Sequence, residues 1–235
     1  MTRATLRVAW ATNTDLAAVT DDAIQPQERE QAGRYQSGLR RRQYVASRAM
    51  LRALLADHTG QPAASFELIA DERGKPICVD GPAISISHSG DIVACAVMDA
   101  DQVGIDVEFP GRPRNTSGIA ERYFSRDEAE WLAARDSDHF YRLWVLKEAW
   151  LKATGIGIAG GLDQLRCIVE PPHVRLLDDS APVAALRLYA LDDGFLGLAT
   201  VDTSPAATEV RRWLPAQGVF AVDDRPVLLA SSDAT

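Results

Sequence analysis

The sequence lacks three features that would each define a class of protein. No run of about 18 uncharged apolar residues occurs, so a membrane-spanning segment is not expected. Acids appear at Asp15 and at Asp21–Asp22, which is too early for a secretory signal peptide. The cysteines, Cys78, Cys95 and Cys167, are odd in number and do not have the spacing of a metal site. The sequence therefore predicts a reduced, cytoplasmic protein without a disulfide framework.

Basic residues are outnumbered in this chain of 235 residues, which carries a formal net charge of −8. This charge disfavours a general nucleic-acid binder. The basic residues are nevertheless concentrated, because residues 31–56 contain six arginines and no acid. Such an island predicts either a local anion site or a solvated helix face.

Lysine is the scarcest charged residue, since only three of the 25 basic residues are lysines: Lys75, Lys147 and Lys152. Lysine carries a compact point charge, whereas arginine presents a planar fork. A chain that uses arginine for nearly all its cations indicates a specific need for lysine at these three positions.

The remaining pattern mixes helices and strands without a strict β-α-β alternation, which favours an α+β fold. Apolar residues form 46% of the chain, as in ordinary globular proteins. We expect helices that begin at Pro26 and that cover 40–56, 125–134 and 137–154. We expect strands over 6–11, 66–70, 83–87, 92–98, 102–108, 165–169, 185–191 and 196–201. The segment from residue 203 is expected to be less regular, with frayed residues at 231–235.

Two acids alternate with apolar residues in the predicted strand that ends at residue 108. Because successive strand side chains point to opposite faces, Asp106 and Glu108 share one face. Adjacent carboxylates repel each other unless a cation or a proton lies between them, and their oxygens suit Mg²⁺. Solvated acids at the end of a strand are the simpler alternative for this motif.

The predicted helix 137–154 carries another acid among apolar residues. Trp144, Glu148 and Lys152 are spaced four apart and therefore share one helix face. A surface Glu–Lys pair is the simple interpretation, but this helix is apolar almost all round and is expected to be buried. A buried glutamate beside Lys147 and Lys152 calls for a bound anion or metal.

Two turns add residues that suit the binding of phosphate. Ser87 and His88 end a strand and enter a glycine-containing turn, which makes a plausible phosphate cradle, with a structural histidine as the alternative. Gly74, Lys75 and Pro76 lie in a second turn, which fixes a lysine in an exposed position. The motifs together supply cations, hydroxyls and three acids, which suit chemistry at a phosphoanhydride.

In this order and spacing, the motifs G-K-P, S-x-S-H-S, G-I-D-V-E and W-x-x-K-E-A-x-x-K resemble those of the 4′-phosphopantetheinyl transferases. The resemblance runs from Arg34 to about Gly161 and is to the larger, single-chain, surfactin-synthetase-activating form. It implies two similar α+β lobes in a pseudo-twofold arrangement, with the active site in the cleft between them. The implied divisions are an N-terminal lobe on the coenzyme A side (1–100), a C-terminal lobe with the metal and the catalytic helix (101–205), and an extension that packs back (206–235).

The resemblance also implies a reaction: transfer of the 4′-phosphopantetheine arm of coenzyme A to a serine of an apo carrier protein, with release of 3′,5′-ADP. Asp106, Glu108 and Glu148 would hold Mg²⁺, Lys152 would contact the pyrophosphate, and Asp106, Glu148 and Lys152 would be catalytic. The implied contacts with coenzyme A are Arg41, Arg48, Gly74, Lys75, Pro76, Ser87, His88, Lys147 and Lys152. The partner would be a carrier protein or carrier domain of a fatty-acid, polyketide or nonribosomal-peptide synthase. A monomer with no nucleic-acid or membrane partner is expected.

Two positions depart from the pattern of the family. Gln43 stands where an arginine often precedes the aromatic residue, so Arg41, Arg42 or Arg48 is expected to contact the 3′-phosphate instead. Val107, between two of the implied metal ligands, cannot coordinate, and a water molecule is expected to take that place.

The proton acceptor and the reaction both retain alternatives. Glu148, Glu128 or a metal-bound water could take the proton of the carrier serine. A capping box over Ser125–Glu128 favours a structural role for Glu128. The alternative functions are Mg²⁺-dependent hydrolysis of the coenzyme A pyrophosphate and a non-catalytic coenzyme A-binding module. The sequence does not identify the carrier or separate Mg²⁺ from Mn²⁺.

Overall fold

The structure is a computed structural model that describes residues 5–72, 74–99, 102–110, 114–157, 161–183, 185–202, 204–221 and 226–232. Residues 73, 111–113 and 158–160, and residues 233–235 of the predicted frayed end, are among those outside the described residues. Within the described ranges, no helix has the length and apolar character needed to cross a membrane. The cysteines Cys78, Cys95 and Cys167 are free thiols.

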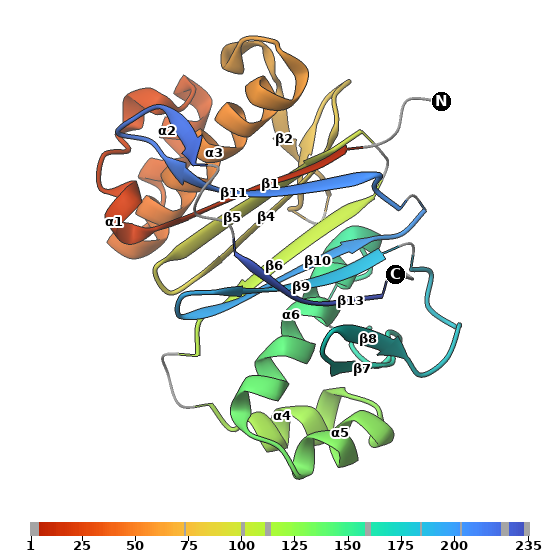
Figure 1. Ribbon diagram of the computed structural model, residues 1–235. Helices are drawn as coiled ribbons and strands as arrows, with labels where there is room; N and C mark the ends of the chain where they lie inside the picture. The colour runs from red at the N-terminus through yellow and green to blue at the C-terminus, as the bar shows by residue number, and fades with distance from the viewer. Residues whose placement is uncertain are drawn as a thin grey trace.

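Helices and strands are mixed along the chain, which confirms the predicted α+β class (Figure 1). The helices are α1 (Asn13–Leu16), α2 (Pro26–Gly33), α3 (Gly38–Thr59), α4 (Thr116–Tyr123), α5 (Arg126–Ala133) and α6 (Ser137–Thr154). The strands are β1 (Thr5–Thr12), β2 (Leu68–Ala70), β3 (Pro76–Cys78), β4 (Ala83–Ser89), β5 (Ile92–Met98), β6 (Val103–Glu108), β7 (Cys167–Glu170), β8 (His173–Leu176), β9 (Ala185–Leu191), β10 (Gly194–Thr200), β11 (Ala207–Leu214), β12 (Val219–Ala221) and β13 (Val227–Ser231).

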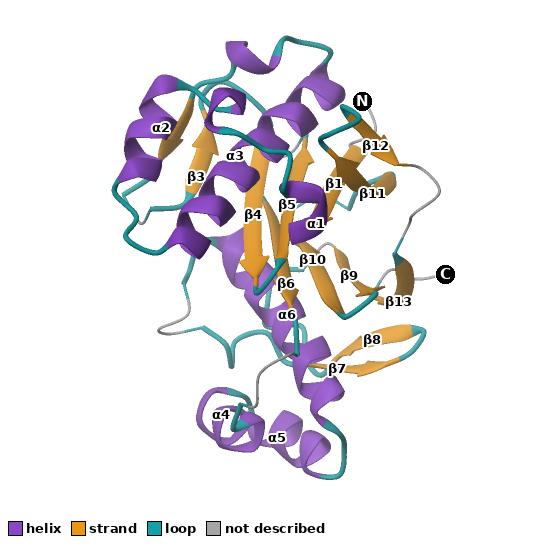
Figure 2. Ribbon diagram, turned by 90° about the vertical axis from the view of Figure 1, so that its left-hand side faces the viewer, coloured by secondary structure: helices purple, strands orange, loops and turns teal. Residues whose placement is uncertain are grey.

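The first sheet has the strand order β12-β11-β1-β5-β4, and α3 covers one of its faces (Figure 2). This helix extends the one that the sequence predicts over 40–56. The side chain of Ser37 caps its first turn, and Gly60, in the left-handed conformation, ends it. Buried residues of its inner face, such as Leu51 and Leu54, pack against β1 and β5 and anchor the helix.

The second sheet has the strand order β6-β10-β9-β13-β8-β7, and α6 packs closely on β6 and β10. A Cβ atom on Gly104 would overlap the carbonyl of Ala149, and one on Gly197 would overlap the backbone of Val145. Glycine at these two strand positions therefore lets the helix lie directly on the sheet. In Figure 1, α4, α5 and α6 lie on the opposite side of the strands from α1, α2 and α3.

The two sheets meet through an apolar core and along one edge. Val8 and Ala94 of the first sheet and Ile105 and Leu196 of the second belong to one buried cluster. At the edge, β4 lies beside β6, although the two strands belong to different sheets. Three serine hydroxyls on β4 accept hydrogen bonds from backbone N–H groups of β6 and of the residue after it. Side chains thus join the two sheets at this seam.

The C-terminal segment is more regular than the sequence predicts. β11 pairs in parallel with β1, from Thr5 opposite Ala207 to Trp10 opposite Arg212. β13 pairs antiparallel with β9 in the other sheet. Both pairings are remote in sequence, so local periodicity does not reveal them. The segment after residue 206 therefore contributes strands to both sheets.

Candidate active site

A pocket of about 700 Å³ opens between α3, the turn before β3, β4, β6 and α6. It brings together most of the residues that the sequence analysis selects: Arg48, Gly74, Pro76, Ser87, His88, Asp106, Glu108, Glu148 and Lys152. These residues come from separate parts of the chain and meet because both sheets and both long helices border one cavity.

Asp106 lies at the acidic end of this pocket, on β6. One of its carboxylate oxygens, Oδ1, accepts hydrogen bonds from Ser87 Oγ and Lys152 Nζ, each at 2.7 Å. The other oxygen, Oδ2, is buried and has no hydrogen-bond partner among the described residues. Oε1 of Glu148 is buried and unpartnered in the same way. Two unpaired carboxylate oxygens at one pocket indicate capacity to bind a cation.

The acids of the pocket perturb one another. Burial raises the pKa of Glu148 to about 7, and the charge of Asp106 adds to this rise more than that of Lys152 offsets it. Burial also raises the pKa of Glu108, with a further rise caused by Asp106. Crowded carboxylates of this kind are more stable when a cation lies between them.

Cations occupy the other side of the same pocket. Arg48 lines it, and within the described part of the chain its buried Nη1 atom has no hydrogen-bond partner. Nη1 of Arg40 lies 3.4 Å from Nδ1 of His88. Burial lowers the pKa of His88, and the charges of Arg40 and Lys152 lower it further. Unpaired positive groups facing one cavity suit an anionic ligand.

Lys75 lies at the rim, where the turn that precedes β3 meets the end of α6. Its Nζ donates to the backbone carbonyl oxygen of Lys152 at 2.6 Å. Its backbone N–H donates to Oδ1 of Asp71 at 2.8 Å, which holds the turn. Burial lowers the pKa of the Lys75 ammonium group. Lys75 borders two adjoining cavities. Its hydrogen bond to the carbonyl oxygen of Lys152 links the turn to α6.

The arginines of residues 31–56 do not form one patch. Arg41 makes an ion pair with Asp21 and, with Arg42, lines a separate cavity of about 360 Å³. Arg52 is buried and makes a two-pronged contact with Glu28. The structure thus places the predicted contact Arg41 away from the main pocket, because an acid from the preceding segment binds it.

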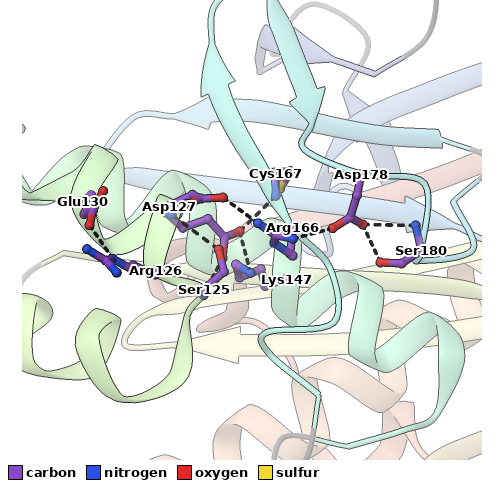
Figure 3. Close-up of polar contacts among 10 residues, drawn as sticks. Ser125, Arg126, Asp127, Glu130, Lys147, Arg166, Cys167, Asp178 and Ser180 are labelled. Carbon is purple, nitrogen blue, oxygen red and sulfur yellow. Dashed lines mark hydrogen bonds and ion pairs between the residues drawn. The ribbon is translucent and has the colours of Figure 1, made fainter.

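Lys147 and Glu128 are also separate from the pocket. They form a fully buried ion pair at 2.7 Å. Figure 3 shows Lys147 near Ser125 and Cys167. Lys147 Nζ also donates to the carbonyl oxygens of Leu162 and Leu165, while Glu128 accepts from the backbone N–H of Cys167 at 2.9 Å. The predicted capping box between Ser125 and Glu128 is present. These contacts give both charged residues a structural role.

Sequence reasoning missed several residues that line the pocket. Arg40 and Tyr44 lie along the cavity, as does Arg114, whose Nη1 lies 3.3 Å from Oε1 of Glu108, whereas Trp144 lines it beside Glu148, as their helical spacing predicts. The arginine island contained the signal for Arg40 but not its orientation. Arg114 belongs to a Pro/Gly/Arg loop whose course cannot be read from local pattern.

No group of three or more histidine, cysteine or acidic side chains in the described parts of the chain is already arranged to hold a metal ion. The donor set nevertheless fits one. Asp106 and Glu148 each present a buried oxygen without a partner, and these oxygens are of the hard type that Mg²⁺ prefers.

Two family models together match most of the chain. Residues 102–196 match the model of the 4′-phosphopantetheinyl transferase superfamily, and residues 8–100 match that of the 4′-phosphopantetheinyl transferase N-terminal region. The 4′-phosphopantetheinyl transferase HetI of Nostoc sp. is 32% identical over 196 residues, which cover 80% of each chain. The chain belongs to the 4′-phosphopantetheinyl transferase superfamily. It is therefore a transferase enzyme, as the motifs predict.

Two further relatives are also named as phosphopantetheinyl transferases. A 4′-phosphopantetheinyl transferase of Bacillus pumilus is 33% identical over 192 residues, or 78% of this chain and 80% of that protein. An L-aminoadipate-semialdehyde dehydrogenase-phosphopantetheinyl transferase of Mus musculus is 31% identical over 166 residues, or 63% of this chain and 54% of that protein. The residues matched by the two family models include strands of both sheets and the residues that line the pocket.

Proposed function

We propose that this transferase moves the 4′-phosphopantetheine arm of coenzyme A onto a serine hydroxyl of an apo carrier protein, and that 3′,5′-ADP leaves. The observation that carries this proposal is the division of charge in the pocket. Acids with unpartnered oxygens line one side, and cations such as Arg48 line the other. A pyrophosphate with its counter-ion requires both.

The cationic side is proposed to bind coenzyme A. Arg48 would contact the 3′-phosphate, since its Nη1 is buried without a partner in the pocket. Ser87 and His88 would contact phosphate oxygens, and Gly74 and Pro76 would border the adenine. Lys75 would support this arrangement by its link to the end of α6.

The acidic side is proposed to hold Mg²⁺ through Asp106, Glu108 and Glu148. When bound, the ion would neutralise charge on the phosphates and on the leaving group. Lys152 would add a positive charge beside the pyrophosphate, since its Nζ already lies 2.7 Å from Asp106 Oδ1. Such fixed charges lower the barrier because they need no rearrangement during the reaction.

Glu148 is the proposed acceptor of the proton from the carrier serine. Its carboxylate lines the pocket beside Lys152, and its Oε1 is buried there, so it can accept a proton from a hydroxyl that enters the cavity. Glu128 is buried against Lys147 and does not line the pocket, so it is not the proposed base. The serine oxygen would bond to the β-phosphorus, and the bond to the oxygen of 3′,5′-ADP would break.

The carrier is proposed to belong to a fatty-acid, polyketide or nonribosomal-peptide synthase, because each presents a serine for this modification. We propose a monomer, since one chain supplies every residue of the pocket, and we propose that it acts in the cytoplasm. The division into lobes at 1–100 and 101–205, with an extension at 206–235, is likewise a proposal.

The test is the intact mass of several apo carrier proteins after incubation with the transferase, coenzyme A and Mg²⁺, with EDTA as the control. A carrier that gains one phosphopantetheine group, and fails to gain it in EDTA, would support both the reaction and the metal. Hydrolysis of coenzyme A with no carrier modified would instead favour the hydrolase. Coenzyme A that binds and remains intact would favour a binding module.

A further inference from the structure

The seam between β4 and β6 is built from three alternate serines. The hydroxyl of Ser85 accepts from the backbone N–H of Ile105 at 3.1 Å. Those of Ser87 and Ser89 accept, each at 3.3 Å, from the next two N–H groups on the same side of the strand, at residues 107 and 109. The three serine side chains thus share one role, which is to accept hydrogen bonds from backbone N–H groups at the edge of the second sheet.

Two of these hydroxyls perform a second task. Ser87 Oγ donates to Asp106 Oδ1 at 2.7 Å, and Ser89 Oγ donates to Glu108 Oε2 at 2.8 Å. Among the hydrogen bonds of the described residues, Ser85 makes none to a carboxylate. A hydroxyl has one proton and two lone pairs. One serine can therefore accept a hydrogen bond from a backbone N–H group and donate one to a carboxylate at the same time.

Two contacts restrain the Glu108 carboxylate, and the hydrogen bond from Ser89 restrains it more strongly than the ion pair with Arg114. The other carboxylate oxygen of Glu108, Oε1, meets Nη1 of Arg114 at 3.3 Å, and the side chain of Arg114 is 41% exposed. A long, exposed arginine restrains its partner weakly. The short bond from Ser89 comes instead from a strand that is itself fixed by the sheet.

We propose that Ser89 is a positioning residue: its hydroxyl joins the two sheets and holds the Glu108 carboxylate in the orientation that binds the divalent cation. This inference rests on the proposed function, because it requires Glu108 to be a ligand of the cation. Mutation of a residue that orients a metal ligand typically lowers metal affinity by about 10–100-fold. The metal affinity of this transferase therefore depends on Ser89.

The test is a titration of the full chain with Mn²⁺ alone, followed by electron paramagnetic resonance of the free ion. Ser89→Ala is expected to weaken Mn²⁺ binding by about tenfold. Ser89→Thr keeps the hydroxyl and is expected to restore the affinity. Ser85→Ala is the matched control, because it removes the same kind of seam contact from the same strand without touching an acid. It is expected to lower the melting temperature but leave Mn²⁺ affinity unchanged.

A double-mutant cycle makes the test independent of any loss of stability. If Ser89 acts through Glu108, then Ser89→Ala adds no further loss of Mn²⁺ affinity to Glu108→Gln. Equal affinity of the wild type and Ser89→Ala would overturn the positioning role but leave the metal site intact. Equal losses in Ser85→Ala and Ser89→Ala would also overturn it, since the seam alone would explain them. A wild type that binds no Mn²⁺ would overturn the proposed metal site, and the positioning role with it.

Discussion

Helix α6 carries two lysines, and each makes an ion pair with a carboxylate at 2.7 Å. The Lys147–Glu128 pair is closed, because neither side chain is exposed and backbone groups complete its contacts. The Lys152–Asp106 pair is open: 30% and 8% of the side chains are exposed, and Asp106 keeps an unpartnered oxygen. The same pairing thus supports the fold at one position and retains binding capacity at the other.

The largest expected effect comes from breaking the closed pair. Lys147→Met leaves the carboxylate of Glu128 buried without its cation, and we expect a loss of about 3–5 kcal/mol in the free energy of unfolding. Lys152→Met, at the open pair, is expected to cost less, since that ammonium group is partly exposed and Ser87 still donates to the remaining carboxylate. Urea unfolding of the two variants measures this difference. Equal losses would contradict the distinction between a structural and a functional lysine.

Substitutions around the open pair are expected to change activity more than stability. Glu148→Gln removes a charge at nearly constant shape, and we expect the rate of carrier modification to fall by at least about a hundredfold. The melting temperature of the variant should be no lower than that of the wild type, because the substitution removes a buried carboxylate that Asp106 and Glu108 repel. Glu130→Gln, on the exposed face of α5, is the matched control and should retain full activity. Normal turnover by Glu148→Gln would contradict its proposed role.

A smaller effect separates the arginines of α3. Arg48→Ala should raise the KM for coenzyme A by about tenfold, because an unpaired cation that meets a phosphate contributes roughly one charged hydrogen bond. It should leave the KM for dephospho-coenzyme A, which lacks the 3′-phosphate, nearly unchanged. Arg41→Ala should alter neither value, since Asp21 already binds that side chain. The same penalty with both ligands would refute contact with the 3′-phosphate.

The most gradual effect, spread over several pH units, is a dependence of stability on pH. An acid whose pKa rises on folding binds more protons in the folded state, so the free energy of unfolding falls as pH rises toward the folded pKa. For Glu148 that value is about 7. Between about pH 5 and pH 8 in EDTA, the wild type should therefore lose stability relative to Glu148→Gln. Melting temperatures across this range that run parallel for both proteins would contradict the raised pKa.

The sequence was sufficient wherever one element alone determines the arrangement. Helical spacing predicted that Glu148 and Lys152 face the same side of α6, and both line the pocket. Strand alternation predicted that Ile105 turns to the apolar core while Asp106 and Glu108 turn away, and the structure confirms it. Both periodicities are properties of the backbone and need no knowledge of partners.

Prediction failed where a partner remote in sequence decides the outcome. The apolar character of α6 indicated that Lys147 is buried, but only the packing of α5 shows that Glu128 meets it. Arg40 and Arg41 are equivalent in composition, yet Asp21 withdraws Arg41 while Arg40 reaches His88. The strand β11 was not predicted for the same reason, because its partner β1 lies near the other end of the sequence.

Gly104 and Gly197 set a limit on how this enzyme can be altered. Each lies where α6 rests directly on the backbone of β6 or β10, so any larger residue must push the helix away from the sheet. Glu148 and Lys152 would move with it, and the pocket would lose its alignment without losing a single chemical group. In a library of random variants these two positions should be almost invariant, while residues that line the mouth of the cavity vary. Substitutions that reshape the pocket would therefore have to leave these two glycines in place.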